Sequence, residues 1–321
     1  MLVSITLIFA GFVLLIWSAD RFVMGAAALA RNLGVSPLLI GLTIVGFGTS
    51  APEILVSGMA SLQGNPGLAI GNALGSNIAN IGLILGITAI VVPLAVNSDV
   101  LRKEYPLLLI VSMVSYVLLM DDELGRVDGA ILMLGLFISM FIVVKIGKRR
   151  QQSDVLAQEF TDEIPSDMST ARSVMWFCIG LVLLLIGSRL LVTGAVDVAK
   201  TFGVSDLVIG LTIVAVGTSL PELATSIASG LKGEHEMAVG NILGSNLYNL
   251  LAVLSIPGLV SPGPVAQEVL RRDMPVMLGL TLALFLMGTG RHGKGNITRM
   301  AGAVLLLAFV AYQCWVYYES L

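Results

Sequence analysis

The sequence repeats itself at a fixed offset of 169 residues, and both copies lie in long apolar stretches. GFGTSAPE at 46–53 returns as AVGTSLPE at 215–222, and GNALGSNIAN at 71–80 returns as GNILGSNLYN at 240–249. An offset that holds without a gap over this distance predicts two homologous halves. Any fold for this chain must therefore hold two similar units in which the same polar motif is buried twice.

Apolar segments long enough to span a bilayer, about 20 residues each, recur along almost the whole chain. Of its 321 residues 56% are hydrophobic and 12% are charged, which is about half the charged share of soluble domains. This composition predicts an all-α polytopic membrane protein, and a net charge of −3 gives no basic face for nucleic acid. Cys178 and Cys314 fall in apolar segments and are expected to be buried, inert thiols. We expect about ten transmembrane helices, near residues 2–19, 36–61, 67–92, 104–120, 127–147, 173–193, 205–231, 236–260, 273–290 and 297–317.

A polar stretch at 148–172 is the one linker candidate, and it divides the chain into predicted units at 1–147 and 173–321. With the N-terminus outside, 13 of the 18 Lys and Arg residues fall on the linker side of the membrane and five on the other. The positive-inside rule then places the linker in the cytoplasm and the N-terminus outside. The N-terminal apolar run has no Lys or Arg before it, which favours a first membrane helix over a signal peptide.

Each predicted unit holds five spans, an odd number, so the second unit enters the membrane in the opposite direction to the first. The result is an inverted-topology repeat of two five-helix units, a pattern typical of secondary transporters with helices broken at the midplane. Corresponding residues of such units meet near mid-membrane. Glu53 and Glu222 are therefore expected to approach one another.

Each of these glutamates follows the sequence Gly-Thr-Ser-x-Pro. A carboxylate at the bilayer centre costs at least about 2.5–3.5 kcal/mol, and two facing carboxylates repel one another unless a cation lies between them. Because Pro52 lacks an N–H, the Gly48 carbonyl is expected to lose its helical partner, and the second copy repeats this arrangement. Backbone carbonyls around Thr49 and Thr218 are therefore candidate ligands beside the acids.

The second motif adds neutral oxygen donors at helical spacing. Three polar side chains recur every four residues in each copy: Asn72, Ser76 and Asn80, then Asn241, Ser245 and Asn249. Carboxylates, carbonyls, hydroxyls and amides suit Ca²⁺, which takes about 6–8 oxygens, and Na⁺, and they argue against zinc or copper. The small residues of the same motif are predicted to serve helix packing: Gly71, Gly75, Gly240 and Gly244.

The paired motifs resemble the α-repeats of the sodium/calcium exchanger family, within the calcium/cation antiporter superfamily, at 41–82 and 210–251. The likeness covers nearly the whole chain and is closest to the bacterial inner-membrane calcium/sodium antiporters, which lack the large regulatory insert of animal exchangers. The resemblance implies Ca²⁺ and Na⁺ as transported ions, the lipid bilayer as the surroundings, no cofactor and no enzymatic activity. It also implies that a monomer suffices for transport, whatever the oligomeric state.

The family pattern also implies roles for individual residues of this chain. It makes two carboxylates and two backbone carbonyls the calcium ligands: Glu53, Glu222, Thr49 and Thr218. It places two amides at the centre of the site: Asn80 and Asn249. The flanking sodium positions would draw on six further residues: Gly46, Ser50, Ser76, Ala215, Ser219 and Ser245.

Asn249 departs from the pattern, because several relatives carry an Asp at this position. With amides at both central positions the site has a charge of about −2 rather than −3. That charge matches one Ca²⁺ or two Na⁺ and argues on electrostatic grounds against three sodium ions. It also argues against potassium dependence, which goes with an Asp at such positions in the family.

The expected function is antiport of Ca²⁺ against Na⁺ by alternating access. Calcium/proton exchange is the first alternative, although those exchangers usually carry an acid where this chain has Gly75-Ser76-Asn77. A cation channel with facing carboxylates is the second, but channels usually form such rings by oligomeric symmetry. An intramembrane hydrolase with an acid dyad is the third, and it has no use for the carbonyls and amides beside the acids.

Overall fold

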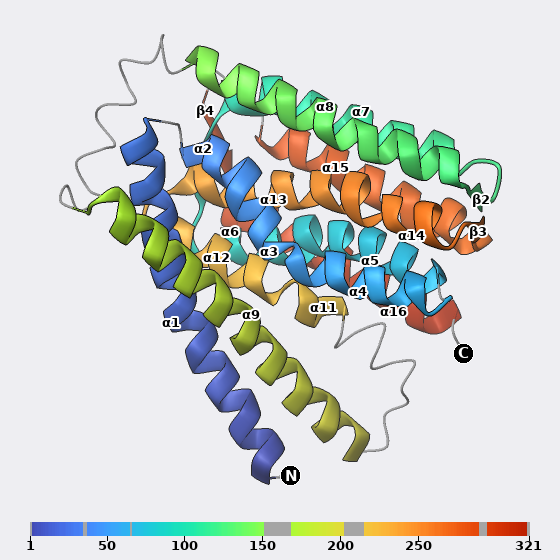
Figure 1. Ribbon diagram of the computed structural model, residues 1–321, viewed down its shortest axis with the longest axis horizontal. Coiled ribbons are helices and arrows are strands. Elements are labelled where there is room, and N and C mark those ends of the chain that lie inside the picture. Colours follow the sequence, from blue (N-terminus) through green and yellow to red (C-terminus); the bar gives the residue numbers. More distant parts are fainter. Residues whose placement is uncertain are drawn as a thin grey trace.

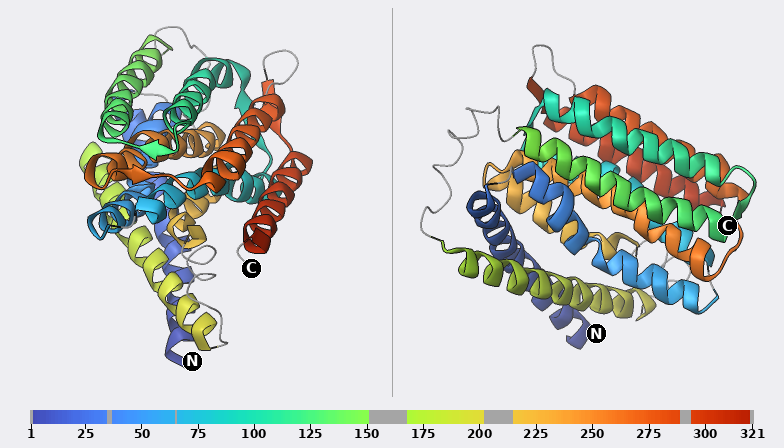
Figure 2. Two further views of the ribbon diagram at one scale, coloured as in Figure 1. Left: turned by 90° about the vertical axis from the view of Figure 1, so that its right-hand side faces the viewer. Right: turned by 45° about the horizontal axis from the view of Figure 1, so that its top comes forward.

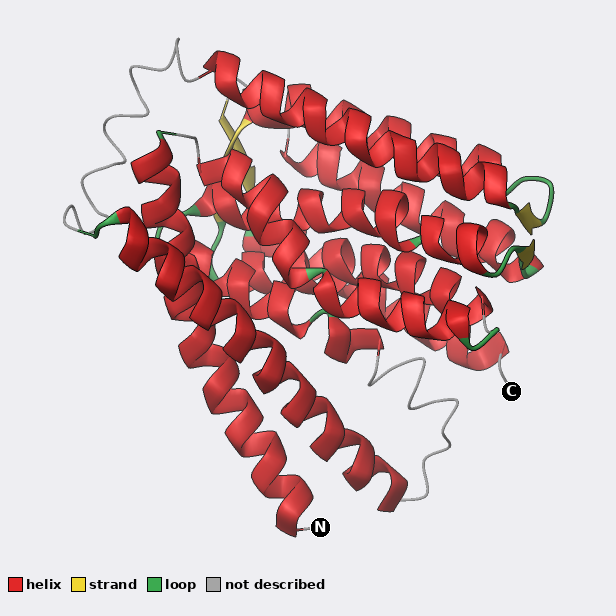
Figure 3. Ribbon diagram, in the orientation of Figure 1, coloured by secondary structure: helices red, strands yellow, loops and turns green. Residues whose placement is uncertain are grey.

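The computed structural model describes residues 2–34, 37–64, 66–150, 168–201, 215–288 and 294–319, which are helical almost throughout (Figures 1 and 3). In the first half the elements, with π-helices marked η, are α1 (Leu2–Leu33), α2 (Pro37–Ile40), η1 (Gly41–Val45), α3 (Gly46–Thr49), α4 (Ala51–Leu62), α5 (Pro66–Ala79), η2 (Asn80–Leu85), α6 (Gly86–Val91), β1 (Leu94–Asn97), α7 (Ser98–Leu118), β2 (Glu123–Leu124) and α8 (Arg126–Arg150). In the second half they are α9 (Thr170–Thr201), α11 (Ala215–Thr218), α12 (Leu220–Leu231), α13 (His235–Tyr248), η5 (Asn249–Val253), α14 (Ser255–Val260), β3 (Gly263–Pro264), η6 (Val269–Asp273), α15 (Met274–Gly288), β4 (Lys294–Ile297) and α16 (Arg299–Glu319). Most of the predicted linker, at 151–167, and the start of the second motif, at 210–214, lie outside the described residues.

Helix boundaries repeat at the same offset as the sequence. The helices α3, α4, α5 and α6 begin at positions 46, 51, 66 and 86, and α11, α12, α13 and α14 begin at 215, 220, 235 and 255. The π-helices η2 and η5 begin at Asn80 and Asn249, which are also 169 residues apart. A π-helical turn is a local widening of an α-helix, with hydrogen bonds between residues five apart, and it often marks a functional site. At these positions the same local sequence therefore produces the same irregular backbone in both halves, whereas the π-helix η6 has no counterpart at the equivalent residues 100–104, which belong to α7.

Two short antiparallel strand pairs join the halves at opposite ends of the helical bundle (Figure 1). In one pair β1 lies beside β4, with Leu94 opposite Ile297. In the other β2 lies beside β3, with Glu123 opposite Pro264. Each pair takes one strand from either half, so the two halves are interlocked rather than stacked as separate bodies.

The chain is a multi-pass membrane protein. A segment Gly41–Thr49 followed by Ala51–Leu62, bent by 48°, has the character of one broken span. The two stretches that carry the amide motif are 72% and 89% buried in their apolar windows, against 22–28% for the others that are long enough to span, so they form the core. Within the described residues six continuous segments have the length and hydropathy to cross a bilayer: Leu2–Leu33, Pro66–Val91, Arg126–Val143, Thr170–Gly187, His235–Val260 and Arg299–Glu319.

The helices α1 and α9 are both longer than the spans predicted at 2–19 and 173–193. The first predicted span ends where charged residues begin, at Asp20 and Arg21. The structure shows that these residues find lateral partners instead of ending the helix. The Arg21 guanidinium lies 5.5 Å from the ring centre of Trp17 and 5.4 Å from that of Trp176, within the range of cation–π attraction.

The same two helices run side by side and antiparallel at one edge of the bundle (Figures 1 and 2). Their backbones touch at glycines. A Cβ atom added to Gly180 would lie 2.6 Å from the backbone nitrogen of Phe22, and one added to Gly25 would lie 2.5 Å from that of Phe177. No other residue fits at such a distance, and small residues that bring backbones together are the usual basis of tight helix pairing in membranes. The α1–α9 pair is therefore expected to behave as one rigid unit.

The two cysteines are exposed, contrary to the prediction that they are buried. An apolar helix in a bilayer turns one face to lipid, which is as apolar as the protein interior. Apolar neighbours in the sequence therefore did not distinguish the lipid-facing side of the helix from the core side. Cys178 lies only two residues before the tightly packed Gly180, on the same helix.

Substitution of Gly180 by leucine is expected to destabilise the protein strongly. The new side chain must push α1 and α9 apart, and overpacking of this kind costs about 1–3 kcal/mol or more. Thermal denaturation in detergent, followed by the loss of the monodisperse peak after heating, measures the effect. The Cys178→Leu variant is the matched control, because it adds bulk on an exposed face of the same helix. Equal melting temperatures for both variants would contradict the close packing.

Candidate functional site

Glu53 and Glu222 each lie in the first turn of a helix that follows a break in the chain. The breaks are at Ser50, with φ −80° and ψ 5°, and at Ser219, with φ −90° and ψ 6°. A helix N-terminus offers unpaired N–H groups and a partial positive charge, which favour an acid, and a proline in this turn loses no hydrogen bond. Both glutamates are fully buried, with 0% of their surface exposed.

The turn that ends α3 provides backbone N–H groups to two carbonyl oxygens of this helix. The carbonyl oxygens of Gly46 and Gly48 both accept backbone N–H groups at this helix end. As the sequence predicted, Pro52 has no N–H to donate to the Gly48 carbonyl, but the carbonyl is not left open. When the donor four residues on is missing, the last turn tightens and a nearer N–H takes its place. The ligand roles expected for the carbonyls of Thr49 and Thr218 stay predictions.

Each glutamate contacts the break of the opposite half. Ser50 Oγ donates to Glu222 Oε1 at 3.3 Å, and Ser219 Oγ donates to Glu53 Oε1 at 3.3 Å. The two contacts are equivalent under the sequence repeat and equal in length. They place both carboxylates at the boundary between the halves, next to both chain breaks.

Two amides of the second motif brace the turns that carry the acids. Asn72 Nδ2 donates to the Glu53 carbonyl oxygen at 3.1 Å and to Ser57 Oγ at 3.0 Å. Asn241 Nδ2 makes the equivalent bond to the Glu222 carbonyl oxygen at 3.4 Å. From the helical spacing both amides were expected to be oxygen donors of the stripe. The structure uses their N–H groups to hold the backbone of the acids in place.

Ser245 joins the second half to the turn of the first. Its Oγ lies within hydrogen-bond distance of Glu222 Oε1 at 3.4 Å and of the Gly46 carbonyl oxygen at 3.5 Å. Thr49 Oγ1 lies 3.4 Å from Ser245 Oγ and donates to Asn241 Oδ1 at 3.0 Å. The hydroxyl groups, the carbonyl and the carboxylate therefore form one continuous polar network across the boundary between the halves.

Five buried oxygens of the two motifs have no hydrogen-bond partner in the part of the chain that the structure describes. An unpartnered buried polar atom costs about 1–3 kcal/mol, so several in the same two repeated motifs point to a ligand. All of the oxygens belong to hard donor types, which fit Ca²⁺ or Na⁺. They come from the first turns of α4 and α12, from α5, and from the starts of η2 and η5: Glu53 Oε2, Glu222 Oε2, Ser76 Oγ, Asn80 Oδ1 and Asn249 Oδ1.

The predicted site residues fall into three groups. Seven of them make hydrogen bonds in two sets: Glu53 with Ser219, and Glu222 with Ser50, Ser245, Thr49 and Gly46. Three are buried and have an unpartnered oxygen: Ser76, Asn80 and Asn249. Two lie in the equivalent turn α11 of the second half: Ala215 and Thr218. Sequence reasoning missed Asn246, which accepts a hydrogen bond from Asn80, although the Ser-Asn pair that contains it recurs in both motifs.

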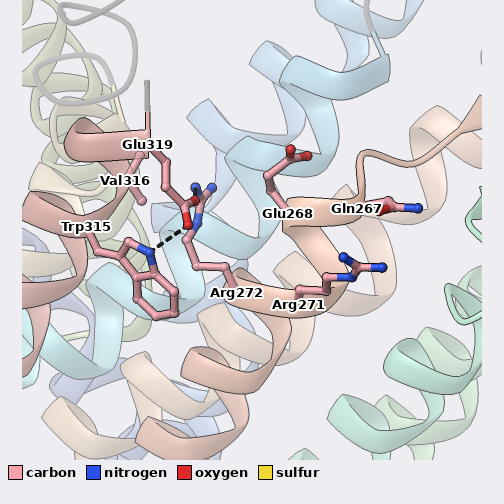
Figure 4. A pocket seen from close by; sticks show the side chains of 7 residues that line it. All are labelled: Gln267, Glu268, Arg271, Arg272, Trp315, Val316 and Glu319. Atoms are coloured by element: carbon pink, nitrogen blue, oxygen red, sulfur yellow. Dashed lines mark hydrogen bonds and ion pairs between the residues drawn. The ribbon is translucent and has the colours of Figure 1, made fainter. Parts of the chain in front are cut away.

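A surface cleft near the end of α16 lies apart from the buried acids (Figure 4). Arg272 is paired there with Glu319 at 2.6 Å and with Asp273 at 2.7 Å, and Trp315 Nε1 donates to Glu319 Oε1 at 2.7 Å. These groups satisfy one another and tie η6 to the end of α16. The lining residues are Gln267, Glu268, Arg271, Arg272, Trp315, Val316 and Glu319.

The fold and the site together define a class of protein: a multi-pass helical bundle in which buried oxygen donors lie at the boundary between two similar halves. The family model described as "Sodium/calcium exchanger protein" matches residues 3–145 and 172–318. CaxA of Alkalimonas amylolytica is 49% identical over 98% of either chain. Inner membrane protein YrbG of Escherichia coli (strain K12) is 41% identical over 100% of this chain and 98% of its own. A solved structure of the sodium-calcium exchanger NCX_Mj matches with a TM-score of 0.83 and 33% identity over 97% of either chain. The chain belongs to the sodium/calcium exchanger family.

Proposed function

We propose that the protein is a secondary antiporter that exchanges Ca²⁺ for Na⁺ across the membrane by alternating access. The observation that carries the proposal is the group of buried carboxylate, amide and hydroxyl oxygens without partners among the described residues. A hard cation satisfies such oxygens, and a site shared between two halves can open to either side when the halves rearrange. The description of NCX_Mj as a sodium-calcium exchanger supports the same function.

In this proposal Glu53 and Glu222 are the carboxylates that bind Ca²⁺, together with the carbonyls of Thr49 and Thr218. Their two negative charges balance one Ca²⁺ or two Na⁺, so the calcium ion and the sodium ions compete for one set of oxygens. An empty site has an uncompensated charge and does not cross the membrane. The other residues that complete the oxygen set are Asn80, Asn249, Ser50, Ser219, Ser76, Ser245, Gly46 and Ala215.

The proposed architecture has about ten membrane helices in two inverted five-helix units at 1–147 and 173–321. The offset helix boundaries, the strand pairs between the halves and the two stretches matched by the family model support this division. The N-terminus lies outside and the linker at 148–172 lies in the cytoplasm of a bacterial inner membrane. One chain carries both carboxylates, so a monomer suffices for transport, and no cofactor is required.

Alternating access is proposed to move the α1–α9 pair against the rest of the bundle. The glycine contacts between the two helices support a rigid moving unit, because neither backbone can shift without carrying the other. The acids, the serines at the breaks and the amides lie on other elements. The ion site therefore stays assembled while the moving unit covers one side or the other.

Calcium flux under separately imposed gradients tests the function. Proteoliposomes loaded with Na⁺ and diluted into sodium-free buffer with ⁴⁵Ca²⁺ are expected to accumulate calcium at least about tenfold above vesicles loaded with choline. A K⁺ gradient alone should give only the choline background, since the site lacks the third acid. The result that would overturn the proposal is calcium accumulation that does not depend on internal sodium.

The same vesicles distinguish the alternatives. Accumulation driven by an acidic interior without sodium would assign calcium/proton exchange. Rapid flux that does not saturate with calcium and needs no counter-ion would assign a channel. A carrier that must change conformation for every ion load is expected instead to saturate at a low rate.

A further inference from the structure

The side-chain amide of Asn80 is held by a residue of the opposite half. Asn80 Nδ2 donates to Asn246 Oδ1 at 3.0 Å, and both side chains are buried with 1% of their surface exposed. The other end of the amide, Asn80 Oδ1, has no partner within the described residues. The bond therefore fixes the donor end of the amide and leaves its acceptor end available.

Orientation matters for an amide at a cation site because its two ends are chemically opposite. The oxygen can coordinate a cation, whereas the NH₂ group is a donor and repels it. A carboxylate has no such requirement, since both of its ends are oxygens. A central asparagine therefore needs a second residue that captures its NH₂ group, and residues that orient metal ligands commonly affect affinity by about 10–100-fold.

We propose that Asn246 is a positioning residue that keeps the amide oxygen of Asn80 available to the transported cation. The inference rests on the proposed function, because it deepens the account of the same ion site. Asn246 does not contact the ion. It acts through Asn80. Its side-chain oxygen accepts a hydrogen bond from the Asn80 NH₂ group, and this bond would be lost if the Asn80 amide turned over.

The equivalent bond in the other half is not formed in the described structure. It would join Asn249 Nδ2 to Asn77 Oδ1, and both of these atoms are buried without a partner among the described residues. Asn77 instead donates its Nδ2 to the Asn246 carbonyl oxygen at 3.3 Å and to Met277 Sδ at 3.6 Å. The two central amides therefore differ: that of Asn80 is fixed and that of Asn249 is not. This difference makes Asn77 the matched control for Asn246.

A double-mutant cycle between positions 246 and 80 tests the proposal. Equilibrium ⁴⁵Ca²⁺ binding to the purified full-length protein in sodium-free detergent buffer gives the Kd of each variant. Asn246→Leu is expected to weaken binding about tenfold in the wild-type background. In the Asn80→Asp background the same change is expected to weaken binding less than about twofold, because a carboxylate presents oxygen in either orientation.

A residue that merely supports the fold would give the same factor in both backgrounds, and that result would overturn the proposal. Wild-type affinity in the Asn246→Leu variant would overturn it as well. Asn77→Leu, which makes the same side-chain change at the equivalent position, is expected to change the Kd by one factor that does not depend on position 80. If the Asn246→Leu variant does not purify as a monodisperse protein, Asn246→Ala removes the same acceptor oxygen and replaces it in the double-mutant cycle.

The cycle also separates this inference from the proposed function. Wild-type protein that binds no Ca²⁺ and shows no sodium-driven uptake would contradict both the proposed function and the positioning role of Asn246. Wild-type protein that binds and transports Ca²⁺, with equal effects of Asn246→Leu in both backgrounds, would end only the positioning role.

Discussion

Glu53→Gln and Glu222→Gln are each expected to reduce sodium-driven calcium uptake in proteoliposomes by at least about 100-fold. Each substitution keeps the shape of the side chain and removes one of the two negative charges at the boundary between the halves. One remaining charge cannot balance Ca²⁺, and a loss of about 2.7 kcal/mol in binding already corresponds to a factor of about 100. Full transport by both variants would contradict the site assignment.

Glu268→Gln is the matched control for this pair, because Glu268 is exposed at the surface cleft of Figure 4. It is expected to transport at the wild-type rate. Thermal stability provides a second readout. Saturating Ca²⁺ should stabilise the wild type, by about 2.7 kcal/mol at a concentration 100 times the Kd, and should not stabilise the two site variants. Equal stabilisation of all the proteins would place the calcium ion elsewhere.

Gly244→Ala is expected to abolish most transport although it adds a single methyl group. A Cβ atom at this position would collide with the carbonyl oxygen of Leu42 and would lie 2.9 Å from the carbonyl carbon. Both neighbours are backbone atoms, so α13 and η1 must separate, and such overpacking costs about 1–3 kcal/mol. The separation would also pull Ser245 away from the Gly46 carbonyl oxygen. We expect sodium-driven uptake to fall at least about tenfold.

Gly279→Ala is the control for this substitution. Gly279 lies in α15, and no atom of the described residues lies within 4 Å of an added Cβ. It is expected to retain both wild-type uptake and the wild-type melting temperature. Normal transport by Gly244→Ala would show that the two backbones can separate without disturbing the site, and would contradict the packing role that the sequence predicted for this glycine.

Much of the helical architecture could be predicted from the sequence. The repeat register correctly indicated that a break precedes each of the two acids at equivalent positions, because the same residues surround both breaks. The expected burial of Glu53 and Glu222 is confirmed. Membership of the sodium/calcium exchanger family, expected from the motifs, is confirmed by the family match. The sequence was wrong about the two cysteines, because an apolar helix in a membrane has both a lipid-facing side and a core side.

The partners of each polar group could not be predicted in the same way. Helical periodicity indicates which residues share a face, but it says nothing about which other helix covers that face. Asn72 and Asn80 lie on one predicted stripe and looked equivalent as oxygen donors. In the structure Asn72 braces the backbone of Glu53, whereas the amide of Asn80 is held by Asn246 of the other half.

By itself the sequence determined the local events: where the chain breaks before each motif acid, and that an acid follows each break. These depend on residues within a few positions of one another. Only the tertiary structure decided that Ser50 contacts Glu222 and that Ser219 contacts Glu53, rather than each serine contacting the acid of its own half. That choice depends on how the two halves pack across their shared boundary, through glycines too close to another backbone to have a side chain.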